Sequence, residues 1–76
     1  MFKYLTMNFA TDKKGRVHLH ETQEYRSKAN AIEMTNRSVK EQPFYPPDGE
    51  FIVLYQISAF EPIKFTEMRR WDERTN

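Results

Sequence analysis

The chain begins with two runs in which apolar and polar residues alternate. In residues 2–10 the alternate positions are occupied by Leu5, Met7 and Phe9. A period of two is typical of a β-strand, and a second run, residues 16–21, has the same period. Gly15 lies just before this second run and can adopt the left-handed conformation that a tight turn requires. The pattern therefore predicts a β-hairpin.

A different period follows the hairpin. Residues 27–42 contain no glycine or proline, and Pro43 comes directly after them. Small and apolar side chains recur there at the spacing of helix turns, at Ala31, Ile32, Thr35, Ser38 and Val39. Ser27 is a residue type that caps helix N-termini, and proline ends helices. The pattern predicts one helix, capped by Ser27, that buries a narrow stripe of small side chains.

The second half of the chain predicts two further strands. Residues 51–60 are apolar at both odd and even positions, which indicates a central strand buried on both faces. Pro62 interrupts the pattern, and residues 63–68 predict an edge strand, where proline is tolerated. Residues 69–76 predict an unordered or loosely docked tail, apart from Trp71. Together the patterns predict one α+β domain over residues 1–76, a two-layer, four-stranded antiparallel sheet with one helix on one face, in the order β-β-α-β-β.

This layout has a consequence for binding, because one helix can cover only one face of the sheet. Phe2, Tyr4 and one side of the strand at residues 51–60 are therefore expected on or near the other face. Either the tail and the loop at residues 43–49 fold over them, or they form an apolar patch of the kind that contacts a partner. We expect a partner, or a second copy of the chain as a homodimer, to bind there.

Composition narrows the possible functions. The 76 residues include no cysteine, which excludes disulfides and thiolate metal sites. No apolar stretch approaches the ~20 residues of a membrane span, and the N-terminus lacks the pattern of a signal peptide, so we expect a cytoplasmic protein that binds no membrane. The net charge of +1 does not favour indiscriminate binding to nucleic acid. The charge is uneven, since residues 1–30 have an excess of basic side chains and residues 31–60 an excess of acidic ones.

Two histidines are the most obvious candidates for chemistry. His18 and His20 project from the same face of the predicted strand, close enough to share a metal ion. Zinc needs a third ligand and usually a fourth, but the chain has no other histidine, and Arg16 lies on the same face. We therefore expect them to line a polar face of the hairpin, with no metal and no cofactor. No serine lies in a nucleophile elbow and the two glycines form no phosphate-binding loop, so we expect no enzyme.

Candidate partner-binding residues lie in three parts of the sequence. The predicted hairpin contributes Lys13, Lys14, Arg16, His18 and His20. The proline-rich loop contributes Phe44 and Tyr45, and the tail contributes Arg69, Arg70 and Trp71. Basic groups next to a ring suit phosphates and bases, and rigid rings suit a protein partner. Each set also has a purely structural interpretation, as a solvated hairpin tip or as rings that close the core.

Two resemblances add expectations. Residues 15–40, with the segments QEYRSKA and SVK, are similar to the repeat unit of the YegP-like small proteins, whose function is poorly defined. The order of elements and the late Arg-Arg-Trp resemble small anti-CRISPR proteins of phages, which are single α+β domains of this size. The second resemblance implies a protein that occupies a surface on a host protein or nucleoprotein complex.

The sequence therefore predicts a small non-enzymatic binding protein. The expected function is that of a phage or mobile-element inhibitor that docks on a host protein or nucleoprotein complex. The alternative is a nucleic-acid-binding regulator that uses the basic hairpin and the Arg-Arg-Trp segment.

Overall fold

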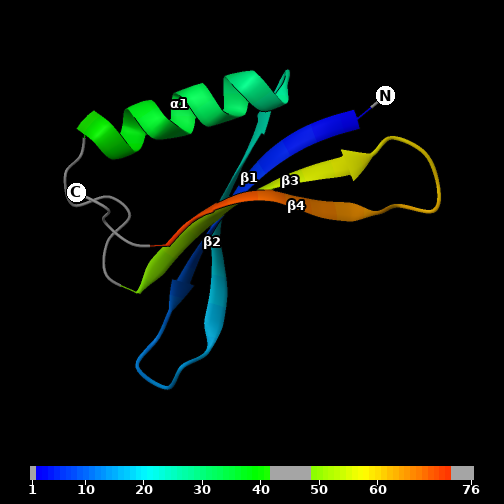
Figure 1. Ribbon diagram of the computed structural model, residues 1–76. Coiled ribbons are helices and arrows are strands. Elements are labelled where there is room, and N and C mark those ends of the chain that lie inside the picture. Colours follow the sequence, from blue (N-terminus) through cyan, green and yellow to red (C-terminus); the bar gives the residue numbers. More distant parts are fainter. Residues whose placement is uncertain (1, 42–48, 73–76) are drawn as a thin grey trace.

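The computed structural model describes residues 2–41 and 49–72, which form four strands and one helix (Figure 1). In chain order the elements are β1 (Phe2–Thr11), β2 (Val17–Tyr25), α1 (Lys28–Glu41), β3 (Glu50–Ser58) and β4 (Phe65–Trp71). The strands form one open antiparallel sheet in the order β2-β1-β3-β4, and α1 lies along one side of it. The predicted α+β fold with the order β-β-α-β-β is confirmed.

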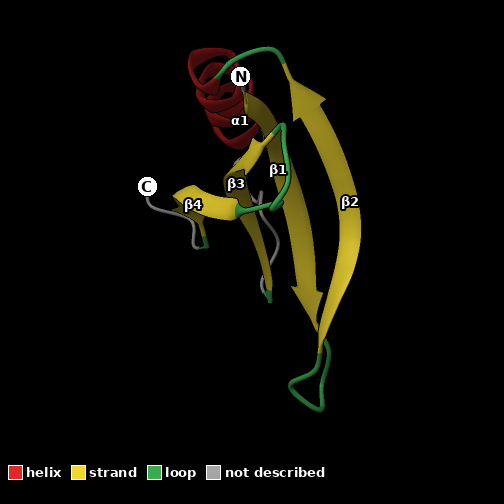
Figure 2. Ribbon diagram, turned by 90° about the vertical axis from the view of Figure 1, so that its right-hand side faces the viewer, coloured by secondary structure: helices red, strands yellow, loops and turns green. Residues whose placement is uncertain are grey.

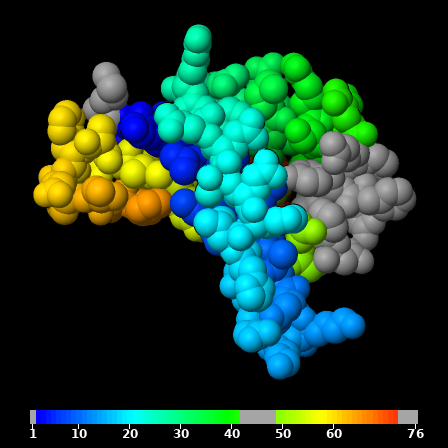
Figure 3. All heavy atoms as spheres, turned by 180° about the vertical axis from the view of Figure 1, so that it is seen from behind, coloured from blue at the N-terminus to red at the C-terminus, as the bar shows by residue number. Residues whose placement is uncertain are grey.

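The first two strands form the predicted hairpin, with a turn built around Asp12 and Gly15. Gly15 has a φ of 80°, the left-handed conformation expected at this position. The Asp12 carboxylate accepts hydrogen bonds from the backbone N–H groups of Lys14 and Arg16, both at 2.9 Å. β2 is longer than its alternating run predicts, because it remains paired with β1 as far as Tyr25. The hairpin projects from the rest of the molecule as an arm (Figure 3).

The helix begins where the sequence predicts. The backbone N–H of Asn30 donates to Ser27 Oγ at 3.1 Å, so Ser27 caps the N-terminus of α1. The small side chains of Ala31 and Thr35 are buried, as the narrow stripe requires, and α1 lies over one side of the sheet (Figure 2). Within the described residues no helix has the length and apolar composition needed to cross a membrane.

The main core lies between α1 and the sheet. Its buried centre consists of Ala31, Ile52, Leu54 and Trp71, and the side chains packed around that centre are Tyr4, Tyr25, Ile32, Val39 and Met68. Trp71 is 8% exposed and donates its indole Nε1–H to Asn36 Oδ1 at 3.0 Å. This hydrogen bond ties the last residue of β4 to the helix.

The structure corrects the expected position of Tyr4. The alternation of β1 places Tyr4 with Thr6 on the helix side, where Tyr4 packs against the core and its hydroxyl donates to Gln56 Oε1 at 3.4 Å. The physical reason is that β3 is apolar on both faces, so the alternation of β1 alone does not determine which of its sides meets the helix. Phe2, the other residue expected on or near the uncovered face, is also on the helix side by the alternation of β1, opposite Ser58, and is 50% exposed at the start of the strand.

The structure also corrects the start of the predicted tail. Arg69, Arg70 and Trp71 are the last three residues of β4 and pair with β3. The register of this pair shifts once, and Trp71 falls opposite Ile52 on the helix side. Burial of so large a ring favours pairing to the end of the strand. Residues 73–76 of the predicted tail lie outside the described residues.

Candidate functional site

The face of the sheet opposite α1 is the first candidate site. Side chains directly opposite each other in neighbouring strands share a face, and the register places Met7, Val53 and Arg70 in one row. We call the apolar part of this surface the helix-free face; its residues are Leu5, Met7, Phe9, Phe51, Val53, Tyr55, Ile57 and Phe65. β1, β3 and β4 all contribute, so segments far apart in the sequence build one surface.

Contacts between rings confirm that these side chains form one surface. The rings of Phe9 and Phe51 stack, with their centroids 5.1 Å apart, and Tyr55 meets Phe65 edge to face at 5.8 Å. The Arg70 guanidinium lies over Phe51, 4.3 Å from the ring centroid. Aromatic side chains and arginine are the residues that most often contribute large binding energies at protein interfaces.

The helix-free face is only partly buried within one chain. Val53 at its centre is 2% exposed, but Phe65 at its β4 edge is 52% exposed. The surface continues along the hairpin through Leu19, which is opposite Phe9 and is 56% exposed. Among the described elements, the helix contacts the sheet from the other side (Figure 2). A contiguous apolar surface of this kind is typical of a contact with another molecule.

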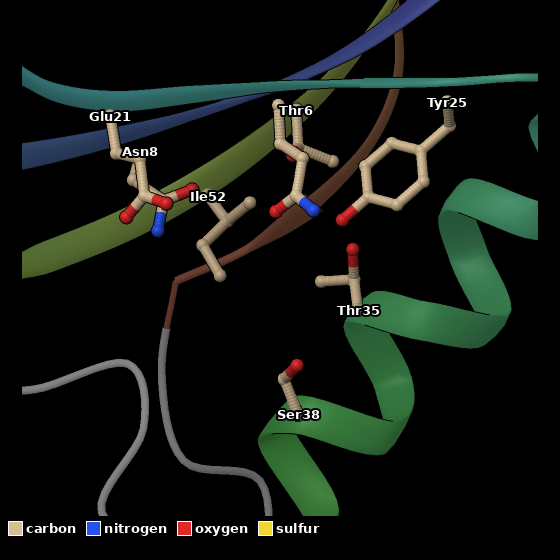
Figure 4. A pocket seen from close by; sticks show the side chains of 8 residues that line it. Thr6, Asn8, Glu21, Tyr25, Thr35, Ser38 and Ile52 are labelled. Carbon is tan, nitrogen blue, oxygen red and sulfur yellow. The ribbon is translucent and has the colours of Figure 1, made fainter.

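A second candidate site lies between α1 and the first two strands (Figure 4). It is a pocket of about 50 Å³ whose lining includes Thr6, Asn8, Glu21, Tyr25, Thr35 and Ser38. Nothing in the sequence marks these side chains as a site, because they come from three separate elements. No motif in the sequence joins them.

The hairpin tip holds charged groups gathered around Asp12. Arg16 Nε donates to Asp12 Oδ2 at 2.8 Å, and His18 Nε2 lies 2.9 Å from the same oxygen. Hydrogen bonding to His18, followed by the backbone N–H of Arg16, lowers the pKa of Asp12 from 3.8 to about 2. His20 has another acidic neighbour, since its Nδ1 lies 3.5 Å from Glu50 Oε1. Across the described residues, no group of three or more His, Cys, Asp or Glu side chains is placed to hold a metal ion.

The remaining candidates from the sequence are dispersed. Lys13 and Lys14 are exposed at the hairpin tip, away from the end of β4 (Figure 1). The Arg69 guanidinium lies over Trp71, 5.1 Å from the ring centroid, and Trp71 itself is buried. The tryptophan ring therefore closes the core and offers no open platform on which a base could stack. Two further candidates lie outside the described residues, Phe44 and Tyr45.

Comparisons with known proteins provide no information on function, so the function is inferred from the sites described above. The resemblances to the YegP-like repeat unit and to anti-CRISPR proteins stay predictions. No protein-family model matches this chain, and a search of curated proteins and of solved structures found no similar protein.

Proposed function

We propose that this chain is a non-enzymatic binding protein that docks on another protein through the helix-free face. The observation that carries the proposal is the row of aromatic and aliphatic side chains on β1, β3 and β4 that no described helix or strand covers. Burial of apolar surface is the dominant favourable contribution to most protein association. Docking on this face would supply the cover that one helix cannot provide on both sides of the sheet.

The composition of the face fits a protein partner. Aromatic rings lie on both sides of the buried Val53 at its centre, and Arg70 adds a guanidinium above the Phe51 ring. Charged residues of both signs lie around it, because Lys3 is opposite Ile57 and Glu24 is opposite Leu5. An apolar centre with a polar rim is the usual anatomy of a protein interface. Such a protein would act by occupying a surface of its target. The resemblance to anti-CRISPR proteins implies the same mode of action, in which the occupied surface belongs to a host complex and the complex is inhibited.

The test uses two matched pairs of exposed apolar residues. One variant, Leu19→Gln with Phe65→Gln, changes the helix-free face at positions 56% and 52% exposed. The control, Phe2→Gln with Phe60→Gln, changes the start of β1 and the loop after β3, at positions 50% and 75% exposed. Immobilised wild-type and variant proteins capture partners from a nuclease-treated bacterial host lysate, and bound proteins are identified by mass spectrometry. Sedimentation equilibrium of each protein records self-association.

The expected result is a protein partner that wild type and control retain and that the face variant loses by at least about tenfold, the effect of removing roughly 1.4 kcal/mol of binding free energy. Equal capture by all three proteins would overturn the proposal. So would a partner that disappears with nuclease treatment. Self-association that only the face variant loses would identify a second copy as the occupant and would also contradict docking on a different protein.

The nucleic-acid alternative has less support from the geometry. Arg16 and His18 both engage the Asp12 carboxylate, and the Trp71 ring is buried. The exposed Lys13 and Lys14 remain the strongest reason to consider phosphate contacts. Binding through them would weaken steeply with salt and would be lost in the Lys13→Glu, Lys14→Glu variant.

A further inference from the structure

The pocket between α1 and the first two strands has an unusual lining for the inside of a small domain. Strand β1 contributes Thr6, β2 contributes Glu21 and Tyr25, and α1 contributes Thr35 and Ser38, and Figure 4 shows these side chains around one space. Its volume of about 50 Å³ corresponds to room for roughly three to five water molecules, at ~10–15 Å³ for each. It therefore accepts a small polar group.

Two of the lining hydroxyls belong to buried residues and have no hydrogen-bond partner among the described residues. Thr6 is 3% exposed and Thr35 is 5% exposed. Neither hydroxyl forms a hydrogen bond with another residue in the described part of the chain. No fully enclosed side-chain N or O atom there lacks a partner, so what remains exposed of these hydroxyls opens into the pocket. A hydrogen-bonding group in the pocket can therefore take the place of water at both hydroxyls.

The charged residues in the lining indicate which charge a group bound in the pocket should carry. Glu21 is the one charged residue among the described lining residues, and no Lys, Arg or His contributes. A carboxylate only accepts hydrogen bonds, and the hydroxyls of Thr6, Thr35 and Tyr25 can accept as well. An anion would face this carboxylate without a compensating cation. Calcium and magnesium usually take several carboxylates, and the pocket offers a single one.

We propose that this pocket binds a primary ammonium or a guanidinium group, with Glu21 as the ion-pair partner and the buried threonine hydroxyls as hydrogen-bond acceptors. Both groups carry one positive charge and several N–H donors, which matches one carboxylate and several neutral oxygens. The ligand is either a free alkylamine or the end of a lysine or arginine side chain of a bound protein. The pocket and the helix-free face lie on opposite sides of the sheet, so this inference does not depend on the proposed docking.

Amide chemical shifts measured by NMR can follow the titration of this pocket. Methylammonium chloride is the probe for a free amine, and N-acetyl-lysine-N-methylamide is the probe for a protein side chain. Tetramethylammonium chloride is the control, because it has the same charge and no N–H donor. The variants are Glu21→Gln, and Glu24→Gln as the matched change on the same strand, where residue 24 faces the other side of the sheet opposite Leu5.

Saturable shifts confined to residues around Thr6, Glu21 and Thr35 are expected with methylammonium and absent with tetramethylammonium. Loss of one charge-assisted hydrogen bond weakens binding about tenfold or more in Glu21→Gln, and Glu24→Gln binds as wild type does. Tighter binding of the lysine derivative identifies a protein side chain as the ligand, and equal or weaker binding identifies a free amine. Equal shifts with both ammonium salts, or none with either amine, overturn the proposal and leave the pocket as a site for water. Dispersed amide spectra of both variants establish that they are folded.

Discussion

The two faces of the central strand β3 differ in what covers them, although both are apolar. On the helix side, Ile52 and Leu54 are 2% and 0% exposed beneath α1 and belong to the main core. On the other side, Phe51 and Tyr55 are only half-buried and contact rings of the neighbouring strands. The comparison shows that one strand can complete a core on one face and present an interaction surface on the other.

The comparison also shows where polar groups lie. The helix side, which is covered, contains the pocket with the buried hydroxyls of Thr6 and Thr35. The helix-free side is mainly apolar between its charged edges. A protein surface ordinarily has the opposite arrangement, with polar groups on the open side. This inversion is why we assign a small cationic ligand to the covered face and a protein partner to the open one.

The largest expected effect is a difference in stability between a substitution on the helix side of the sheet and one on the helix-free face. Leu54→Ala removes a fully buried side chain from the main core and should lower the free energy of unfolding by about 2–5 kcal/mol. Leu5→Ala removes a half-buried side chain from the helix-free face and should cost about 1 kcal/mol. Urea denaturation of both variants and of wild type measures the difference. Domains of this size have ~5–10 kcal/mol in total, so Leu54→Ala should be close to unfolding at physiological temperature.

Equal losses in these two variants would break the comparison. They would mean that the helix-free face is as well covered in solution as the helix side, either by a second copy of the chain or by the loop at residues 43–49 and the tail. Repeating the denaturation at several protein concentrations separates the two cases, because the stability of a dimer rises with concentration.

The fold could be predicted because its signals are local. Alternation identified the two sides of β1, and Ser27 marked the start of the helix. The side on which the helix packs could not be predicted, because β3 is apolar at odd and even positions alike. That choice depends on the fit of Ala31 and Thr35 against the sheet, which is a contact between distant segments. Tyr4 was therefore expected on the wrong face of the sheet.

The second prediction tests the hydrogen bond between Trp71 and Asn36, which holds the end of β4 to the helix. Asn36→Ala leaves the buried indole N–H of Trp71 without its acceptor and should cost about 1–2 kcal/mol. The control is Arg37→Ala, which breaks an exposed ion pair with Glu33 at 3.2 Å and should cost no more than about 0.5 kcal/mol. Urea denaturation followed by fluorescence measures both, since Trp71 is the only tryptophan. An equal, small effect in both variants would mean that Trp71 is held by packing alone.

The candidate sites were harder to predict than the fold. An uncovered apolar face followed from the layout, but Phe2 and Tyr4 were expected there in place of Leu5, Met7 and Phe9. The pocket did not follow from the layout, because Thr6, Glu21 and Thr35 become neighbours only when the helix has packed on the hairpin. Single polar residues carry no signal of such a neighbourhood.

The third prediction sharpens the assignment of the pocket. Thr35→Val keeps the shape of the side chain and removes a buried hydroxyl that has no partner among the described residues. The free energy of unfolding should therefore stay the same or rise by up to about 1 kcal/mol, measured by urea denaturation without added amine. Thr22→Val, exposed on β2 opposite Met7, is the control and should change the stability by less than about 0.5 kcal/mol. A loss above about 1 kcal/mol in Thr35→Val alone would show that the hydroxyl already has a bound partner such as water.

The smallest effect on stability is expected at the hairpin tip, which projects away from the helix and from the rest of the molecule (Figure 3). Hydrogen bonds from His18 and Arg16 lower the pKa of Asp12 from 3.8 to about 2 in the folded protein. Because the folded value is below the unfolded one, the carboxylate adds stability above pH 3.8, and this contribution is lost as the pH falls through about 2.

Asp12→Asn cannot form the charged contacts, so its melting temperature should lie slightly below that of wild type at neutral pH. The gap should close progressively between pH 4 and pH 2, roughly the interval between the two pKa values. A gap that stays constant down to pH 2 would show that Asp12 orders the turn through its shape and backbone bonds, and that its charge contributes nothing to the stability of the arm.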